Sequence, residues 1–264
     1  MRRLFLVICL IAAPVLAVGG DLREWRDADV VFLGEQHDNP AHHARQAALV
    51  EMLRPTALVF EMLTEAQAAR VTPALRGDRA ALADVLDWDA SGWPDFAMYY
   101  PIFAAAPDAE IRGAAIPRDQ ARAAMQTGMQ AVFGPEAADF GLTERLPEAE
   151  QAMRQTLQAE AHCNALPETM LPVMVEIQRL RDAALARAAR DAVAALGGPV
   201  VVITGNGHAR LDWGAPAALE RAAPTLSMRS LGQGETPTGA PPGGFDVVEI
   251  TAPVDRGDPC AAFR

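Results

Sequence analysis

The chain has 264 residues and a formal net charge of −11, and all 23 of its basic residues are arginine. A nucleic-acid partner is disfavoured because binding to phosphates requires a concentrated basic face, which this acidic chain does not show. The absence of lysine excludes Schiff-base and P-loop chemistry, whereas arginine can still recognise carboxylates through two parallel hydrogen bonds. The length suits one α/β domain with a helical insertion.

The first residues have the pattern of a secretory signal peptide. Arg2 and Arg3 supply positive charge, and the apolar run over residues 4–16 is too short to span a membrane comfortably. Small residues predict cleavage after Ala17, and Cys9 lacks the lipobox of a lipoprotein. We therefore expect a soluble periplasmic or secreted protein, with a signal peptide at 1–17, one domain over 18–252 and a tail over 253–264.

Two cysteines, Cys163 and Cys260, remain after the predicted cleavage. In an oxidising compartment they are candidates for a disulfide across 97 residues, and two unpaired buried thiols are the alternative. There is no Cys-x-x-Cys-His sequence, which excludes covalent attachment of a c-type haem.

Buried strand patterns alternate with helical patterns along the chain, which predicts an α/β fold with parallel strands. The predicted strands cover residues 29–33, 57–60, 111–116, 199–204, 225–231 and 245–250. The main predicted helices cover residues 40–53, 64–77, 118–134, 172–196 and 215–223. Residues 78–107 and 135–170 form a predicted helical insertion lobe. The Gly- and Pro-rich residues 232–244 form a predicted mobile loop.

Polar side chains follow three of the predicted strands, and parallel strands would bring them to one edge of the sheet. These side chains are Glu35, His37, Glu61 and His208. Two carboxylates and two imidazoles are a plausible site for a divalent metal ion that activates water. Without a metal, the same groups are suited to general acid–base catalysis. The set therefore indicates a hydrolase as one functional class.

Structural roles are an alternative for several of these residues. Glu35 and Glu61 each precede a predicted helix, where a carboxylate is stabilised by the helix dipole. His42 and His43 lie in the first turn of the predicted helix 40–53 and could be ordinary exposed residues. His37 and His208 are harder to explain structurally, because a loop after a strand is a poor place for a core histidine.

An aromatic segment over residues 88–103 suggests a different chemistry. Tyr99 and Tyr100 lie in this segment. Tyrosinate is an established ligand of ferric haem. Aromatic side chains also pack well against a porphyrin. Arg118, after the third strand, is a candidate partner for a propionate carboxylate. The alternative is that this aromatic segment is simply part of the hydrophobic core.

Several stretches taken together resemble the ChaN family of iron-regulated, haem-binding uptake proteins, within the larger Tiki/TraB-like group. They span most of residues 29–215 in order and are specific only jointly. The matching stretches are Leu33-Gly34-Glu35-Gln36-His37-Asp38-Asn39-Pro40, Val59-Phe60-Glu61-Met62, Ala115-Ile116-Pro117-Arg118, Gln178-Arg179-Leu180-Arg181-Asp182-Ala183 and Gly205-Asn206-Gly207-His208-Ala209-Arg210.

The resemblance implies an exported protein with a three-layer α/β/α fold, a mainly parallel sheet and a helical lobe. It also implies a non-covalent b-type haem, held between two protomers of a homodimer, and transport components of the outer or inner membrane as partners. Tyr100, with Tyr99 as the alternative, would ligate the iron. His37, His42, His43 or His208 would meet the propionates. Missing lysines and a missing lipobox are departures from the family pattern.

Some members of the wider group use the Gly-x-x-His pattern for hydrolysis, as metal-dependent peptidases or esterases. Gly34-Glu35-Gln36-His37, Glu61 and His208 match that pattern. A haem-binding uptake protein is the preferred interpretation. The aromatic segment supports haem binding and gives no support to a hydrolase. A metal-dependent hydrolase is the alternative, and an exported partner-binding protein with neither activity is a third class.

Overall fold

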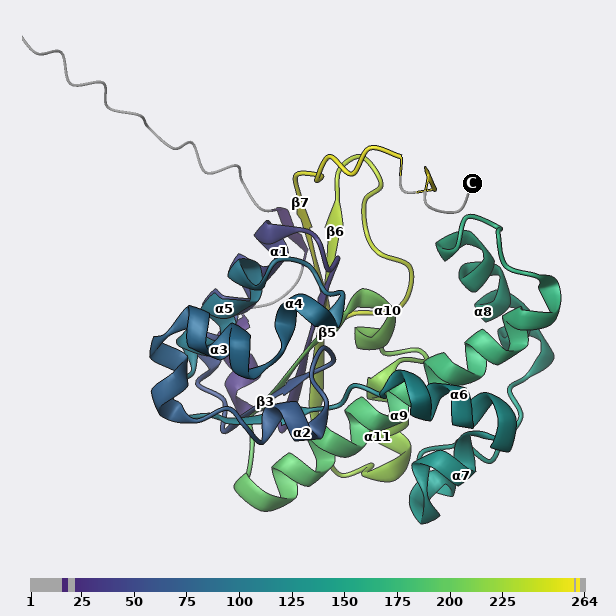
Figure 1. The fold of residues 1–264 in the computed structure, drawn as a ribbon, viewed down its shortest axis with the longest axis horizontal. Helices are drawn as coiled ribbons and strands as arrows, with labels where there is room; N and C mark the ends of the chain where they lie inside the picture. The colour runs from purple at the N-terminus through teal and green to yellow at the C-terminus, as the bar shows by residue number, and fades with distance from the viewer. Residues whose placement is uncertain (1–15, 19–21, 259, 262–264) are drawn as a thin grey trace, which may run out of the picture.

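The computed structural model describes residues 16–18, 22–258 and 260–261, and its centre is a seven-stranded sheet (Figure 1). The strand order is β1-β7-β6-β2-β5-β3-β4. All neighbours from β7 to β4 pair in parallel, and β1 pairs antiparallel with β7. The strands are β1 (Leu16–Val18), β2 (Val30–Glu35), β3 (Ala57–Phe60), β4 (Glu110–Gly113), β5 (Val200–Gly205), β6 (Met228–Glu235) and β7 (Val247–Thr251). The predicted signal peptide lies outside the described residues except for positions 16 and 17.

The three central strands form the core because both of their faces are covered. Every residue of β2, β3 and β5 is buried, as expected for continuous apolar runs in a parallel sheet. Two hydrophobic clusters lie on opposite faces of the sheet. The structure thus confirms the predicted three-layer α/β/α fold.

Helices cover the two faces in separate groups (Figure 1). On one side lie α1 (Pro40–Leu53), α3 (Arg79–Val85), α4 (Trp88–Ser91) and α5 (Phe96–Ala105), and on the other α6 (Arg118–Thr127), α7 (Met129–Phe133), α9 (Leu171–Leu196) and α11 (Ala215–Ala222). The α8 helix (Glu148–Ala161) packs on α9, away from the sheet. Short elements complete the chain: η1 (Leu22–Asp27), α2 (Glu65–Ala68), η2 (Pro73–Gly77), η3 (Pro135–Ala138), η4 (Glu168–Met170) and α10 (Asn206–Ala209).

Three local expectations were wrong. The predicted helix 64–77 is two short elements, α2 over Glu65–Ala68 and the 3-10 helix η2 over Pro73–Gly77, because Pro73 lacks the backbone donor that a continuous helix needs. The predicted helix 118–134 is two helices, because Gly128 has a φ of +87°, which ends α6 before α7 begins. The predicted mobile loop begins too early, since residues 232–235 belong to β6 and are buried. A Cβ at Gly232 would lie 2.8 Å from the ring of Phe245, so glycine here lets that ring pack directly on the strand.

The aromatic segment is largely part of the core. Trp88, Phe96, Tyr99 and Phe103 are buried, and the Phe103 ring stacks on Phe60 at 4.3 Å between centroids. Within the described parts of the chain, no helix has the combination of length and apolarity needed to cross a bilayer.

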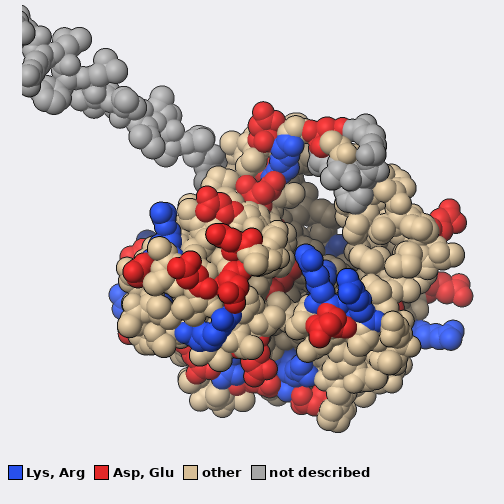
Figure 2. Space-filling view, in the orientation of Figure 1, with Lys and Arg blue, Asp and Glu red and all other residues tan. Residues whose placement is uncertain are grey.

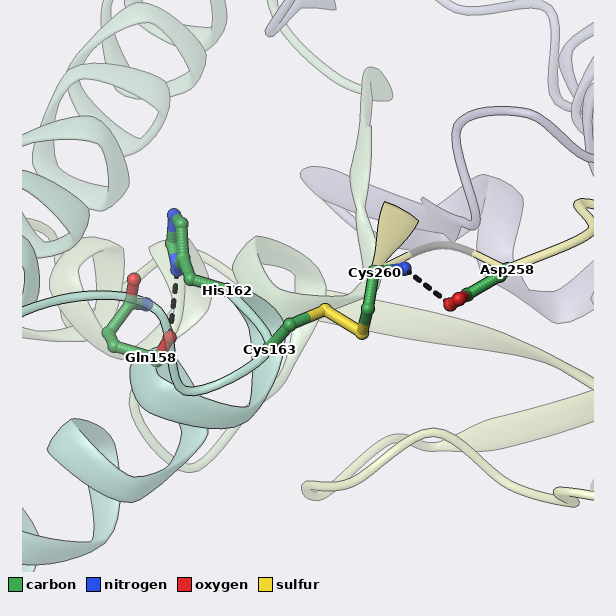
Figure 3. Close-up of a disulfide and its surroundings, with 5 residues drawn as sticks. All are labelled: Gln158, His162, Cys163, Asp258 and Cys260. Carbon is green, nitrogen blue, oxygen red and sulfur yellow. Dashed lines mark hydrogen bonds between the residues drawn. A yellow bond between two sulfur atoms is a disulfide. The ribbon is translucent and has the colours of Figure 1, made fainter. Parts of the chain in front are cut away.

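Cys163 and Cys260 form a disulfide, the first of the two alternatives left open by the sequence (Figure 3). Cys163 follows the end of α8, and Cys260 lies beyond β7 near the end of the chain. The bond therefore connects the helical lobe to the C-terminal segment across 97 positions of sequence.

Candidate functional site

Glu35 is the centre of a buried hydrogen-bonded cluster at the end of β2. Its Oε1 atom lies 2.9 Å from Nδ1 of His37 and accepts a hydrogen bond from the Tyr99 hydroxyl at 3.0 Å. Its Oε2 atom lies 3.1 Å from Nδ1 of His43. Glu35 is thus surrounded by three potential donors, from the loop after β2, from α1 and from α5.

The His43 ring on α1 lies between Glu35 and the loop that carries His37. Nε2 of His43 donates to the carbonyl oxygen of His37 at 2.8 Å, so this nitrogen carries a hydrogen. Nδ1 faces Glu35 Oε2 at 3.1 Å, so these two polar atoms are in close contact deep in the structure.

Charge compensation shifts the pKa values in this cluster. Burial of Glu35 opposes ionisation, but hydrogen bonds from His37 and His43 outweigh it and lower the pKa of Glu35. Burial of His37 likewise disfavours its charged form, yet the hydrogen bond to Glu35 and the charge of Glu61 raise its pKa to about 9. The two shifts favour the charged forms of Glu35 and His37 beside each other.

A second cluster lies at the ends of β3 and β5, around Glu61 and His208. Oε2 of Glu61 accepts hydrogen bonds from the Thr204 hydroxyl at 2.6 Å and from the Gly205 amide at 2.8 Å. Its Oε1 atom lies 3.6 Å from Nε2 of His208. Nδ1 of His208 lies 2.6 Å from an oxygen of Asp182, so the imidazole is held between two carboxylates.

Two residues of this second cluster were not predicted from the sequence. Asp182 and Gln178 lie on α9, and the amide nitrogen of Gln178 is 3.1 Å from Nε2 of His208. Their spacing of four residues places them on one face of the helix. Polar residues at that spacing in an otherwise apolar stripe were the available signal, but nothing local linked them to His208.

The second cluster is also strongly polarised. Burial raises the pKa of Glu61, but the charges of His208 and His37 prevail and lower it to about 2. Burial lowers the pKa of His208, and the charges of Glu61 and Asp182 reverse this and raise it. Burial also raises the pKa of Asp182. The other Asp182 oxygen, Oδ2, has no hydrogen-bond partner within the described residues.

The two clusters meet at Gly205. A Cβ at this position would lie 2.9 Å from Nε2 of His37 and 3.7 Å from Oε2 of Glu61. Any residue other than glycine would therefore require the His37 ring to move. The side chain of His37 is 35% exposed and packs edge-on against Trp93. Among the described residues, Nε2 of His37 has no hydrogen-bond partner.

Arg118 lies near the loop that precedes Trp93. Its guanidinium is 3.9 Å from the Cβ position of Gly92, the residue before Trp93. The side chain is exposed, and within the part of the chain that the structure describes it forms no ion pair. The position of Arg118 therefore agrees with the prediction that it is a candidate partner for a propionate.

The remaining predicted residues lie elsewhere or are enclosed. His42 and His43 are fully buried, so neither is an exposed residue of the first helical turn. Nδ1 of His42 accepts from the Gln36 amide at 3.0 Å, and its Nε2 donates to the Thr251 hydroxyl at 2.9 Å. Burial lowers the pKa of His42, which is consistent with a neutral structural role.

The two neighbouring tyrosines point to different places. Tyr99 is buried with its hydroxyl on Glu35, and burial raises the pKa of that phenol. The Tyr100 hydroxyl donates to the carbonyl oxygen of Arg76 at 2.9 Å. The Arg76 guanidinium in turn binds carbonyls that precede β4, at the opposite end of the sheet from Glu35. Tyr100 is therefore not part of the strand-end site.

The space-filling view shows a hollow beneath the C-terminal segment (Figure 2). Two cavities lie away from the strand-end site: one of about 970 Å³ beside β4, and one of about 410 Å³ between α8, α9 and α11 that reaches Asp182 from behind. Across residues 22–258, no group of three or more His, Cys, Asp or Glu side chains has an arrangement suited to a metal ion.

Fold and site together define an α/β/α protein with a histidine–carboxylate centre at the carboxyl ends of a parallel sheet. The model of the family described as haem-binding uptake, Tiki superfamily, ChaN matches residues 22–219, and the chain belongs to that family. It is accordingly a haem-binding, uptake-related protein. No protein with a curated description matches the chain.

Two solved structures are similar to this one. The first is a structure of cofacial haem binding to ChaN of Campylobacter jejuni, with a TM-score of 0.67 and 18% identity over 87% of this chain and 89% of that one. This level of identity supports a shared fold. The second is the type III effector HopBA1, with a TM-score of 0.47 and 13% identity over 88% and 91% of the two chains.

Proposed function

We propose that the protein is exported and binds haem non-covalently at the strand-end site, with His37 as the iron ligand. The observation that carries the proposal is the state of the His37 ring. Its Nδ1 is fixed by Glu35, its Nε2 has no partner among the described residues, and it is the exposed imidazole of the two clusters. In a histidine that binds a metal, the second ring nitrogen commonly donates a hydrogen bond to a carboxylate. This hydrogen bond orients the ring and increases the basicity of the nitrogen that binds the metal.

The surroundings of His37 fit a haem better than they fit a small ion. Trp93 gives an aromatic surface beside the ring, and Arg118 supplies an exposed guanidinium for a propionate. Ferric haem would supply a Lewis-acidic iron at Nε2 when bound. His37 must lose its proton to ligate, and the nearby carboxylates of Glu35 and Glu61 can stabilise the charge that the iron brings.

Tyrosine ligation is the second arm of the proposal. Tyr99 would have to leave Glu35 and the core, and Tyr100 would have to leave the Arg76 carbonyl, before either hydroxyl could meet an iron at the strand ends. Both changes involve α5. The arrangement of side chains therefore favours His37 over either tyrosine as the ligand.

Two further parts of the proposal concern assembly. The Campylobacter jejuni ChaN structure is one of cofacial haem binding, and we extend that arrangement to this chain as a homodimer with two haems face to face. Transport components of the inner or outer membrane are the proposed partners that deliver or receive the haem.

A haem titration of the purified protein tests the proposal. We expect a saturable shift of the Soret band at one haem per chain or fewer, lost in His37→Ala and retained in His162→Ala, a control on the lobe. Loss of the shift in Tyr99→Phe or Tyr100→Phe, with His37→Ala unaffected, would transfer the ligand role to tyrosine. The absence of any saturable shift in the unmodified protein would refute haem binding.

Hydrolysis is the second candidate, and the opposed pKa values of Glu61 and His37 favour it. At neutral pH Glu61 is an ionised base and His37 a protonated acid, and both lie next to Gly205. Such a divergent pair is typical of acid–base catalysis. Turnover of p-nitrophenyl acetate, measured with and without added Zn²⁺ or Mn²⁺, tests it. We expect Glu61→Gln to abolish turnover and Glu144→Gln, on the lobe surface, to leave it unchanged.

A further inference from the structure

The C-terminal segment contacts the loop that carries His37 and Asp38. Its described residues, 252–258 and 260–261, are here named the strap, which leaves the end of β7 and is bonded to the end of α8 (Figure 1). The space-filling view shows the hollow beneath this segment, between the body of the molecule and the α8 side (Figure 2). The strap therefore lies beside this hollow and next to the residue that follows His37.

One end of the strap is fixed by ion pairs next to His37. Arg256 donates to both oxygens of Asp38, at 2.5 and 2.6 Å, and to both oxygens of Glu235, each at 2.6 Å. Asp38 directly follows His37 in the chain. Asn39 supports the same point by donating to Glu235 at 2.6 Å and to the Ala252 carbonyl at 3.2 Å.

The other end is fixed by a covalent bond to the lobe. Cys260 is bonded to Cys163, and the Cys260 amide donates to Asp258 at 2.9 Å (Figure 3). The two fixed points are the loop after β2 and the end of α8, so the strap connects the residue that follows His37 to the helical lobe.

The strap makes little contact with the hydrophobic core. None of its described residues is buried, so it contributes no side chain to that core. A segment with few buried apolar contacts opens at low free energy once its specific contacts are removed. The disulfide and the Arg256 ion pairs are therefore the main contacts that keep the strap closed.

We propose that the strap is a redox-controlled gate for ligand exchange at the strand-end site. A dithiol reductant would attack one sulfur of the Cys163–Cys260 bond and form a mixed disulfide, and its second thiol would then displace the protein sulfur. Two electrons and two protons pass to the protein, which gains two thiols, and the reductant becomes a disulfide. The released strap would then be held mainly at its Arg256 end.

Amide hydrogen exchange tests the gate without any ligand. After reduction by dithiothreitol, or in the double variant Cys163→Ser/Cys260→Ser, we expect exchange in a peptide covering residues 34–41 to accelerate about tenfold. A peptide over residues 215–222, in α11, is the internal reference and should not change. Equal exchange in oxidised and fully reduced protein, with reduction confirmed by thiol titration, would overturn the proposal.

A ligand-exchange measurement makes the same test at the site, and this arm alone rests on the proposed haem binding. Transfer of bound haem to an excess of apomyoglobin should accelerate about tenfold on reduction and by a smaller factor in Arg256→Gln, which leaves the disulfide intact. Arg229→Gln, an exposed residue at the other end of β6, is the matched control. Unchanged transfer in reduced protein would overturn the gate, whereas accelerated amide exchange in a protein that binds no haem would uphold the gate and refute the ligand.

Discussion

The two histidine clusters at the strand ends have similar chemistry but very different access to solvent. His37 is bound by one carboxylate, is about one-third exposed and has an Nε2 open to a ligand, whereas the side chain of His208 is 5% exposed and has neighbours at both ring nitrogens. Both follow buried strands and both have a raised pKa. The difference teaches that position at a strand end does not by itself make a histidine a ligand, because the packing around its second nitrogen decides whether a ligand can reach it.

Removal of Glu61 is expected to have the largest effect on the buried cluster. Glu61→Ala would leave the charges of His37 and His208 without their shared carboxylate, and the Thr204 hydroxyl without its acceptor. Loss of one partner from a buried ion pair typically destabilises a protein by about 3–5 kcal/mol. Urea unfolding of Glu61→Ala against the unmodified protein measures this, and Glu144→Ala serves as the surface control. A loss below about 1 kcal/mol would mean that the cluster is not charged as described.

Conservative changes in the two clusters should separate ligand binding from structure. Glu35→Gln would weaken the hold on His37 Nδ1, and loss of such a supporting contact typically lowers metal affinity about 10–100-fold. Asp182→Asn alters the corresponding contact of the enclosed His208 and should change haem affinity by less than about threefold. Haem titrations of the two variants make the comparison. Equal losses in both would show that the clusters act as one site.

The pH dependence should also differ between the clusters. The pKa of Glu61 is depressed to about 2, so its contribution to stability is present above its unfolded value of 4.5 and is lost as pH falls toward 2. The pKa of His37 is raised to about 9, so its contribution is present below its unfolded value of 6.5 and is lost as pH rises through 9.

Urea unfolding between pH 2 and 10 measures both contributions. Haem binding through His37 should strengthen as pH rises toward 9, since the ligating ring must be deprotonated. The His37→Gln variant should lose the alkaline part of the stability profile and keep the acidic part. An unchanged alkaline limb in this variant would contradict the assignment of the raised pKa to His37.

The smallest expected effect tests the contact between the clusters. Gly205→Ala would place a Cβ 2.9 Å from Nε2 of His37, and the ring, which is the mobile end of a partly exposed side chain, would have to shift slightly. We expect a change in haem affinity of about twofold to fivefold and a loss of stability of about 1 kcal/mol. Gly77→Ala, where an added Cβ meets nothing within 4 Å, is the matched control. An equal effect of both substitutions would show that His37 is not constrained by Gly205.

Local pattern was sufficient to predict the strand-end location of the site. The runs before Glu35, Glu61 and His208 are fully buried strands, and their parallel pairing follows from the alternation of strands and helices. Residues that end such strands must lie at one edge of the sheet. The class of fold and these polar positions could therefore be read from periodicity alone.

Local pattern could not identify the partners that these residues bind. Asp182 and Gln178 lie on α9, and Tyr99 lies on α5, so their contacts depend on how each helix crosses the sheet. The adjacent Tyr99 and Tyr100 are indistinguishable by composition, yet one bonds to Glu35 and the other to Arg76 because successive residues of a helix face different directions.

The sequence by itself determined the α/β/α fold, the strand-end positions of Glu35, His37, Glu61 and His208, and the pair of cysteines available for a disulfide. Only the tertiary structure decided which histidine is exposed, that His42 and His43 are enclosed, and that the strap pairs with Asp38 next to His37. The physical reason is one of range. Strand formation and burial follow from neighbouring residues, whereas hydrogen-bond partners and solvent access follow from segments such as Arg256 and Asp38 that are 218 positions apart.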